Sequence, residues 1–302
     1  MSKRPYPPQP ICWFGSKVRA RRRILEVIQP IPRRLYVEPF GGSGALFYAK
    51  PAEPSVYNDV NSLLVNFFKV LRTREGRDAI RELSKWTPQC RVFWYEFKEV
   101  CVAYSRGEKD RLRAAIEAAR LADYPEDIAV AFAFFYCQNY GFGGKVLSAF
   151  GETLRPTSCG YEPESFHSRV KHLDLFAESF RFTNITQRDF RDCLEKHDYE
   201  KTLFYCDPPY ESPTSSGYKT GWSSDDTRDL VALLCDLDAS AALSCYDGEL
   251  YSPLLDAGYQ KKSWSSRASV SRDKTLDSRR VETLYWRLSD WAAEKSGEKL
   301  LL

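Results

Sequence analysis

The sequence predicts an α/β fold in which a parallel sheet is interrupted by a block of helices. Short runs rich in β-branched and aromatic residues alternate with helical stretches in two parts of the chain, a pattern typical of a parallel sheet. Between residues 74 and 179 the strand-like runs stop and helical stretches follow one another. We therefore expect a discontinuous α/β domain, residues 1–72 and 185–302, split by a helical domain at 73–184.

The expected strands are short runs bounded by turn residues. They lie at residues 35–38, 55–58, 181–185, 202–206, 241–245 and 281–286. Two helices of the α/β domain are predicted at 60–72, from apolar residues three and four positions apart, and at 225–237, behind the capping residue Ser224. The helical domain has predicted helices at 76–86, 92–105, 109–121, 125–137 and 163–178, around a glycine-rich loop at 139–160.

The composition is that of a folded globular protein. The 302 residues are 43% hydrophobic and 28% charged, with a formal net charge of +3, which excludes a disordered chain and a collagen-like one. The longest apolar run, residues 128–137, is shorter than the ~20 residues that a membrane span needs, and the N-terminus is basic and proline-rich. We expect a cytoplasmic protein that does not cross a membrane.

Nine cysteines are scattered along the chain without one C-x-x-C pair. Most lie in apolar stretches, so we interpret them, Cys206 included, as buried structural thiols in a reducing compartment. His167 with His172, and Cys193 with His197, have no further partners at zinc-site spacing. We therefore predict no metal.

Basic residues are concentrated toward the two ends of the chain. Residues 1–34 carry nine lysines and arginines against one acid, Glu26, and a second excess lies at 261–287. Such runs are often solvated faces, but two of them in one chain favour a polyanionic partner such as nucleic acid.

A strand that ends in a glycine-rich turn is typical of a nucleotide-binding site. Residues 35–38 lead into a Pro-Phe-Gly-Gly-Ser-Gly turn, and Asp59 closes the next expected strand. Glycines let a ligand approach the backbone, and a carboxylate there can accept hydrogen bonds from ribose hydroxyls. The turn lacks both G-x-G-x-x-G spacing and the lysine of a phosphate-binding loop, which disfavours NAD and ATP.

The strongest motif is Asp207-Pro208-Pro209-Tyr210, directly after the apolar strand at 202–206. The prolines fix the backbone, so that the Asp207 carboxylate and the Pro208 carbonyl point outward and the Tyr210 ring presents a face. An exocyclic amino group on a flat heterocycle offers two N–H donors and a π face. The motif therefore predicts a site that can hold a flat heterocycle with an exocyclic amino group.

With these motifs the chain resembles the Dam-type DNA adenine N6-methyltransferases over nearly its whole length. Five segments are similar to the family's N-terminal cofactor motif, glycine loop, ribose-binding pair, adenine-pocket pair and catalytic motif: Trp13-Phe14-Gly15-Ser16-Lys17, Glu38-Pro39-Phe40-Gly41-Gly42-Ser43-Gly44, Asn58-Asp59, Asp189-Phe190 and Asp207-Pro208-Pro209-Tyr210. Asn139-Tyr140-Gly141-Phe142-Gly143-Gly144-Lys145 is similar to the N-x-x-G-F-x-G stretch, and Arg267 with Ser269 and Ser271 to a late R-x-S-x-S segment.

The resemblance implies a Rossmann-like methyltransferase sheet with a helical target-recognition insertion, S-adenosyl-L-methionine as methyl donor, and a flipped adenine in double-stranded DNA as substrate. The implied catalytic residues are Asp207, Pro208, Pro209 and Tyr210. The implied cofactor-binding residues are Trp13, Lys17, Glu38, Pro39, Phe40, Gly42, Gly44, Asp59, Asp189, Phe190 and Asp207. We predict DNA contacts at Asn139, Lys145, Arg155, Arg267 and Arg272. We also expect a monomer, with a dimer left open, and associate the chain with restriction-modification.

Alternative chemistries differ in how well the sequence supports them. Methylation at cytosine C5 is excluded because no Pro-Cys dipeptide supplies a nucleophilic cysteine. Methylation of cytosine N4, or of adenine in RNA, shares the local chemistry, although N4 relatives usually carry Ser in place of Asp207. An inactive nucleic-acid-binding relative is a further alternative. The target bases are not predicted, because residues 146–158 depart from the arginine-containing hairpin of relatives.

Overall fold

The computed structural model describes residues 9–144, 147–151, 163–210, 222–267 and 279–300, although for 163–165, 266–267, 279–280 and 298–300 it describes the backbone alone. The chain divides into two units. The first comprises Met1–Arg19, Gly42–Ala52 and Asn61–Gln187, and the second Ala20–Gly41, Glu53–Val60 and Arg188–Leu302. In this division the segments up to Arg19, at 42–52 and at 61–72 group with the helices expected at 73–184, and the expected domain bounds stay a prediction.

Seven strands form one sheet in the order β3-β2-β1-β4-β5-β7-β6. Their bounds are β1 Leu35–Glu38, β2 Ser55–Asn58, β3 Thr183–Thr186, β4 Thr202–Cys206, β5 Ser240–Tyr246, β6 Gln260–Arg267 and β7 Arg279–Arg287. Strands β2, β1, β4 and β5 pair in parallel, whereas β7 runs antiparallel to both β5 and β6. The α/β fold is confirmed, and the antiparallel end of the sheet is an addition to the parallel sheet expected.

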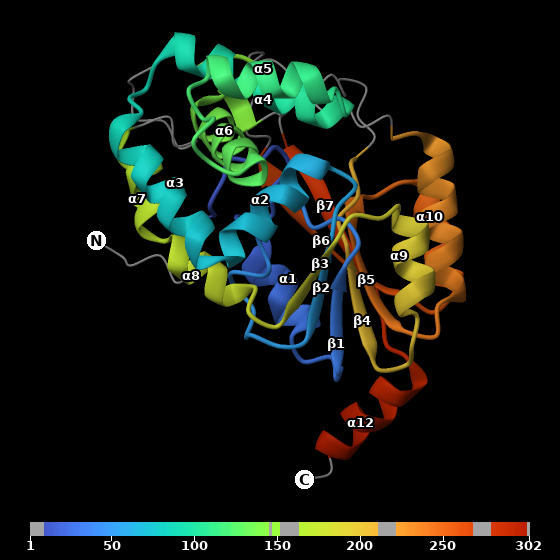
Figure 1. Ribbon diagram of the computed structural model, residues 1–302. Coiled ribbons are helices and arrows are strands. Elements are labelled where there is room, and N and C mark those ends of the chain that lie inside the picture. The colour runs from blue at the N-terminus through green and yellow to red at the C-terminus, as the bar shows by residue number, and fades with distance from the viewer. Residues whose placement is uncertain (1–8, 145–146, 152–162, 211–221, 268–278, 301–302) are drawn as a thin grey trace. The chain divides into compact units, whose positions relative to one another are not determined.

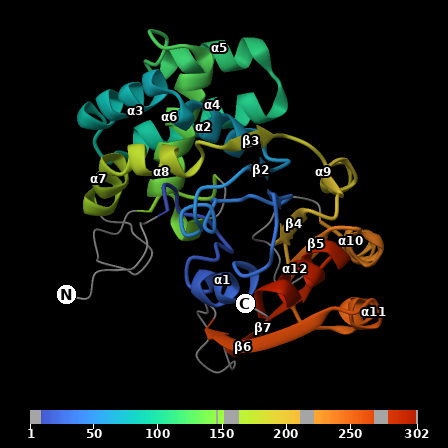
Figure 2. The same ribbon diagram turned by 90° about the horizontal axis from the view of Figure 1, so that it is seen from below.

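In the second unit, helices cover both faces of the strands. Helices α9 (Phe190–His197) and α10 (Ser224–Asp236) lie side by side along one face, and α1 (Arg21–Ile28) lies on the other (Figures 1 and 2). The remaining elements of this unit are η2 (Glu249–Tyr251), α11 (Ser252–Asp256) and α12 (Asp290–Leu300). Alternate strand residues such as Val37, Phe204 and Leu243 form a core with Leu194 and Leu230 of the two helices.

The first unit contains a bundle of helices around an apolar one. Their bounds are α2 Ser62–Arg72, α3 Arg74–Trp86, α4 Arg91–Arg106, α5 Lys109–Ala118, α6 Glu126–Tyr140, η1 Phe142–Gly144, α7 Pro163–Lys171 and α8 Leu173–Ser179. Helix α6 is buried from Ile128 to Tyr140, as expected for a helix that is hydrophobic on all sides. Rings stack across the bundle, with 5.8 Å between the centroids of Phe67 and Phe135. Helices α4 and α5 lie side by side in both views (Figures 1 and 2).

The predicted elements are mostly confirmed, with differences that have local causes. The expected helix at 163–178 is two helices separated at His172, and α10 is capped by Ser223 rather than Ser224. Helix α1 and strand β6 were not expected from the sequence. No helix in the described part of the chain is long and apolar enough to span a bilayer.

Candidate active site

The carboxyl ends of three parallel strands bring the predicted motifs of the second unit to one edge of the sheet. Val37 of β1 is in register with Val56 of β2 and with Phe204 of β4, so Glu38, Asn58 and Cys206 end their strands at the same edge. Ligands of open α/β sheets bind at this edge, where the loops leave the strands.

Asn58 holds the loops at this edge together. Its side-chain amide donates hydrogen bonds of 3.0 Å to the carbonyls of Pro39 and Arg188 and accepts one of 2.9 Å from the Arg188 backbone N–H. The backbone N–H of Gly41 donates to the Asn58 carbonyl at 2.7 Å. Asn58 is fully buried, so this member of the expected ribose-binding pair joins three segments, while Asp59 beside it is half-buried.

Gly41 is required by the close approach of β2 to the turn. A Cβ atom at this position would lie 2.2 Å from a ring carbon of Tyr57. Any side chain would therefore displace that buried ring. Two other members of the turn, Gly42 and Gly44, belong to the first unit and have positive φ angles.

Beside the turn, three aromatic rings from separate parts of the second unit contact one another. Phe40 follows β1, Phe190 begins α9 and Trp222 precedes α10, with ring centroids 5.3 to 5.5 Å apart. Phe190 is buried, whereas Phe40 and Trp222 are half-buried. We call these three residues the aromatic cluster. Trp222 was missed by the sequence reasoning, although an aromatic directly before a Ser-x-x-Asp helix start could have drawn attention to it.

The Asp207 to Tyr210 tetrapeptide follows β4, all of whose residues are buried. Pro208 is buried, while Asp207 and Pro209 are half-buried. The Tyr210 ring is half-buried, but its hydroxyl oxygen has almost no exposed surface. Burial of that hydroxyl, and then the charge of Asp207, raise the pKa of Tyr210 well above its usual value, so the phenol stays neutral.

Tyr205 and Cys206, which precede Asp207, are structural. The Tyr205 hydroxyl lies 2.8 Å from the Ser244 hydroxyl on the neighbouring strand. Burial, and then the charge of Asp207, raise the pKa of the Tyr205 hydroxyl. Cys206 is fully buried, and burial raises the pKa of its thiol well above the usual value. A thiolate nucleophile is therefore disfavoured at this position.

In the first unit, the N-terminal motif is held by the end of α6 and the loop after it. The Phe14 backbone N–H donates to the Gly144 carbonyl at 2.9 Å, and the Gln138 side chain donates to the Cys12 carbonyl at the same distance. Gly144 has a φ of +67°, and a Cβ there would come within 3.0 Å of the Trp13 backbone. The glycine stretch after Asn139 therefore supports the Trp13 motif.

Two further observations place the predicted cofactor residues of the first unit. A Cβ at Gly42 would lie 3.2 Å from the Trp13 indole nitrogen, so these two residues are neighbours. Lys17 is buried, with its ammonium donating to the Gly15 carbonyl at 3.2 Å. Lys17 is therefore not a surface cation.

A DNA contact was expected for Asn139, but this residue lies inside the first unit. Its amide donates to the carbonyls of Pro10 and Phe135 and its oxygen accepts from the buried Arg169 guanidinium. The Asn139 side chain therefore has its partners within its own unit, and its contact with DNA stays a prediction. Lys145, Arg155 and Arg272 lie outside the described residues, as does the side chain of Arg267.

The thiols and acids of the described residues do not form a metal site. No group of three or more His, Cys, Asp or Glu side chains suited to a metal is found there. The described cysteines are all free thiols, and apart from the half-buried Cys90 and Cys235 they are buried.

Comparisons of the amino-acid sequence with known proteins identify relatives of this chain. A family model described as D12 class N6 adenine-specific DNA methyltransferase matches residues 13–275. The chain is 27% identical over 276 residues to the DNA N-6-adenine-methyltransferase of Escherichia phage P1, across 86% of this chain but only 32% of that protein. It is 25% identical to a DNA adenine methylase of Vibrio cholerae, covering 76% of this chain and 75% of that protein. The DNA adenine methylase of Escherichia coli K12 is 24% identical, with coverages of 70% and 68%.

Proposed function

Because this chain belongs to the D12 class of N6 adenine-specific DNA methyltransferases, we propose that it transfers the methyl group of S-adenosylmethionine to the N6 atom of an adenine in double-stranded DNA. The observation that carries this proposal is the Asp207 to Tyr210 tetrapeptide at the carboxyl edge of the sheet, in the same unit as the aromatic cluster. The tetrapeptide suits an amino group, and the cluster suits a flat ring.

The chemistry assigned to the tetrapeptide is positioning of the amino group. Adenine N6 is a poor nucleophile because its lone pair is delocalised into the ring. The Asp207 carboxylate and the Pro208 carbonyl would accept its two N–H bonds, so that the lone pair turns toward the methyl group. The donor would supply the methyl carbon to N6 and leave as a neutral thioether, and N6 would release one proton to solvent. Well-oriented reactants supply roughly 7 to 11 kcal/mol of a barrier, so positioning can dominate this reaction.

Tyr210 is assigned to the flipped base. Its ring is half-exposed and its neutral hydroxyl is buried, which suits stacking rather than proton transfer. Stacking of a base on an aromatic ring is worth roughly 1 to 3 kcal/mol, comparable with the few kcal/mol needed to unstack the base from its duplex. Tyr210 would thus raise the population of flipped adenine.

The methyl donor supplies an electrophilic methyl group on a sulfonium. In the second unit the residues present fit its adenosine part: half-buried rings for the base, and carboxylates at the strand ends for hydroxyl and amino groups. We assign Glu38, Pro39, Phe40, Asp59, Asp189 and Phe190 to this part. From the family resemblance, Trp13, Lys17, Gly42 and Gly44 are assigned to the same ligand, with Lys17 opposite its carboxylate.

The proposed activity is tested by expressing the chain in cells that lack adenine methylation and sequencing their DNA for N6-methyladenine. We expect a modified adenine in a defined sequence context, and none with Asp207→Ala. Chromatography of the product nucleosides distinguishes N6-methyladenine from N4-methylcytosine. It also distinguishes deoxyribonucleosides, which come from DNA, from ribonucleosides, which come from RNA. Binding of DNA and donor without methyl transfer on any substrate would instead identify an inactive relative.

A further inference from the structure

Trp222 belongs to the aromatic cluster but not to any motif that the family resemblance identifies. Its ring lies 5.5 Å from Phe40 in a T-shaped arrangement and 5.3 Å from Phe190 at an interplanar angle of 49°. Two of these rings, Phe40 and Trp222, keep exposed surface while the third is buried. A core contact alone does not require two large rings to remain partly open at the edge of the sheet where ligands bind.

The start of α10 fixes the orientation of the indole. The Trp222 ring nitrogen donates to the Thr227 hydroxyl at 3.0 Å, one turn into the helix. The next residue, Ser223, forms a capping box with Asp226, in which each side chain accepts from the backbone N–H of the other. Since the indole N–H already has a partner, the part of Trp222 left for a ligand is its ring.

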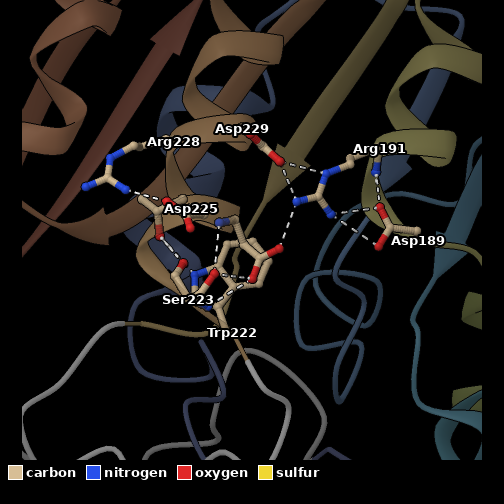
Figure 3. Close-up of polar contacts among 9 residues, drawn as sticks. Asp189, Arg191, Trp222, Ser223, Asp225, Arg228 and Asp229 are labelled. Carbon is tan, nitrogen blue, oxygen red and sulfur yellow. Dashed lines mark hydrogen bonds and ion pairs between the residues drawn. The ribbon is translucent and has the colours of Figure 1, made fainter.

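Arg191 ties this helix start to α9 (Figure 3). Its guanidinium lies 2.8 Å from Asp226 and 2.6 Å from Asp229, both on α10, and 3.3 Å from Asp189, the N-cap of α9. It also lies 4.3 Å from the centroid of the Phe190 ring. One cation thus contacts a member of the aromatic cluster and the Asp226 carboxylate that caps the helix behind Trp222.

We propose that Trp222 is a further binding residue for the adenine base of the methyl donor, and that Arg191 is the positioning residue that holds it in place. This inference rests on the proposed function, because it names one more wall of the same donor site. Adenine fits because it has apolar faces for the rings and an amino edge for a carboxylate, and Asp189 precedes Phe190.

The stacking role is tested by measuring donor binding with substitutions of different shape at position 222. Isothermal titration calorimetry is done with S-adenosylhomocysteine and with 5′-methylthioadenosine, which lacks the amino acid part. Trp222→Ala should weaken both ligands equally, by roughly 5- to 150-fold, the range expected for loss of one stacking contact. Trp222→Phe should restore most of the affinity, and Trp222→Leu should restore less, because leucine fills apolar space without a flat face.

The matched control is Trp86→Ala, which removes an exposed tryptophan at the end of α3 and should leave both affinities unchanged. Equal affinities of the Phe and Leu variants would mean that Trp222 only fills space, and this would overturn the proposal. An unchanged affinity in Trp222→Ala would overturn it too. If the unaltered protein bound neither ligand, the proposed function itself would fail. The two failures are therefore distinguishable, and the Phe and Leu pair decides even if the alanine variant folds poorly.

The positioning role of Arg191 is tested by steady-state kinetics of methyl transfer. Arg191→Gln should raise the KM for S-adenosylmethionine with little change in kcat, because the tetrapeptide is untouched, and Arg191→Lys should recover part of the loss. Arg228→Gln is the control, since Arg228 lies on α10, the helix that Arg191 contacts, and pairs with Asp225 on its exposed side. A kcat loss without a KM change, or equal effects of the Arg191 and Arg228 substitutions, would overturn this role.

Discussion

The rings of Tyr210 and Tyr246 meet edge to face, with centroids 4.5 Å apart and planes inclined by 62°. Tyr246 ends β5, the strand that pairs in parallel with β4, so the contact joins the last residue of the tetrapeptide to the neighbouring strand. A ring held in this way is restricted in its rotation before any base arrives, which lowers the entropic cost of stacking.

Tyr210→Ala should lower both the flipped population and the single-turnover rate, whereas Tyr210→Phe should behave much like the unaltered protein. The reason is that the hydroxyl is buried and neutral while the ring is partly exposed. The measurements are fluorescence of 2-aminopurine at the target position and single-turnover methyl transfer. Equal defects in both variants would assign the role to the hydroxyl.

Asn58→Ala should reduce both the stability of the protein and its affinity for the methyl donor. Each buried polar group left without a partner costs about 1 to 3 kcal/mol, and the Asn58 side chain serves the Pro39 carbonyl and both backbone groups of Arg188. Denaturant unfolding and calorimetry measure the two effects. As a control, Asn61→Ala removes the N-cap of α2 and should lower stability without changing donor affinity. An unchanged donor affinity in Asn58→Ala would show that Asn58 does not support donor binding.

Asn139→Ala should destabilise the protein rather than weaken its electrostatic attraction to DNA. The substitution removes a partner of the buried Arg169 guanidinium, and hydrogen bonds to charged groups contribute about 1.5 to 3 kcal/mol. The checks are urea unfolding and the slope of DNA affinity against salt concentration, which counts phosphate contacts. Unchanged stability together with a shallower slope would indicate that Asn139 contacts DNA.

Asp226→Asn should lower the melting temperature at neutral pH, and the difference from the unaltered protein should vanish in acid. Hydrogen bonds from Arg191, and then from Ser223, lower the pKa of Asp226. A carboxyl whose pKa is lower in the folded state adds stability above its unfolded pKa and loses it as pH falls through the folded pKa. Melting curves from pH 7 down to about pH 2, below the usual pKa of an aspartate, test this. Asp225→Asn is the control, and a constant difference over this range would contradict the prediction.

The sequence predicted the buried strands well because packing on both faces imposes β-branched and aromatic residues. It missed β6, an edge strand whose Gln260–Arg267 residues are mostly polar. It missed α1 because three arginines precede its apolar residues, Ile24, Leu25 and Ile28, which are buried. The antiparallel direction of β7 was also not predictable, since strand direction leaves no mark in a short apolar run.

The candidate site follows from the sequence where its residues are contiguous. The tetrapeptide and the glycine turn each carry their geometry in adjacent residues, whereas the aromatic cluster draws Phe40, Phe190 and Trp222 from three distant segments. The burial of Asn139 was not predicted, for a related reason. A polar residue at the end of an apolar helix suggests solvent, but α6 is buried on all sides, so Asn139 faces other parts of its own unit.

The pairing of β1 with β4 has a consequence for how the chain folds. Leu35 pairs with Thr202, so the centre of the sheet joins residues that are separated by the whole helical insertion. The entropic cost of closing this loop precedes the gain from pairing the strands, which slows folding, whereas helices form from local contacts. During synthesis the insertion is therefore able to collapse first, before β4 is available to pair with β1. The edge that carries the tetrapeptide is complete only after β4 has left the ribosome, so the proposed activity requires synthesis to pass that point.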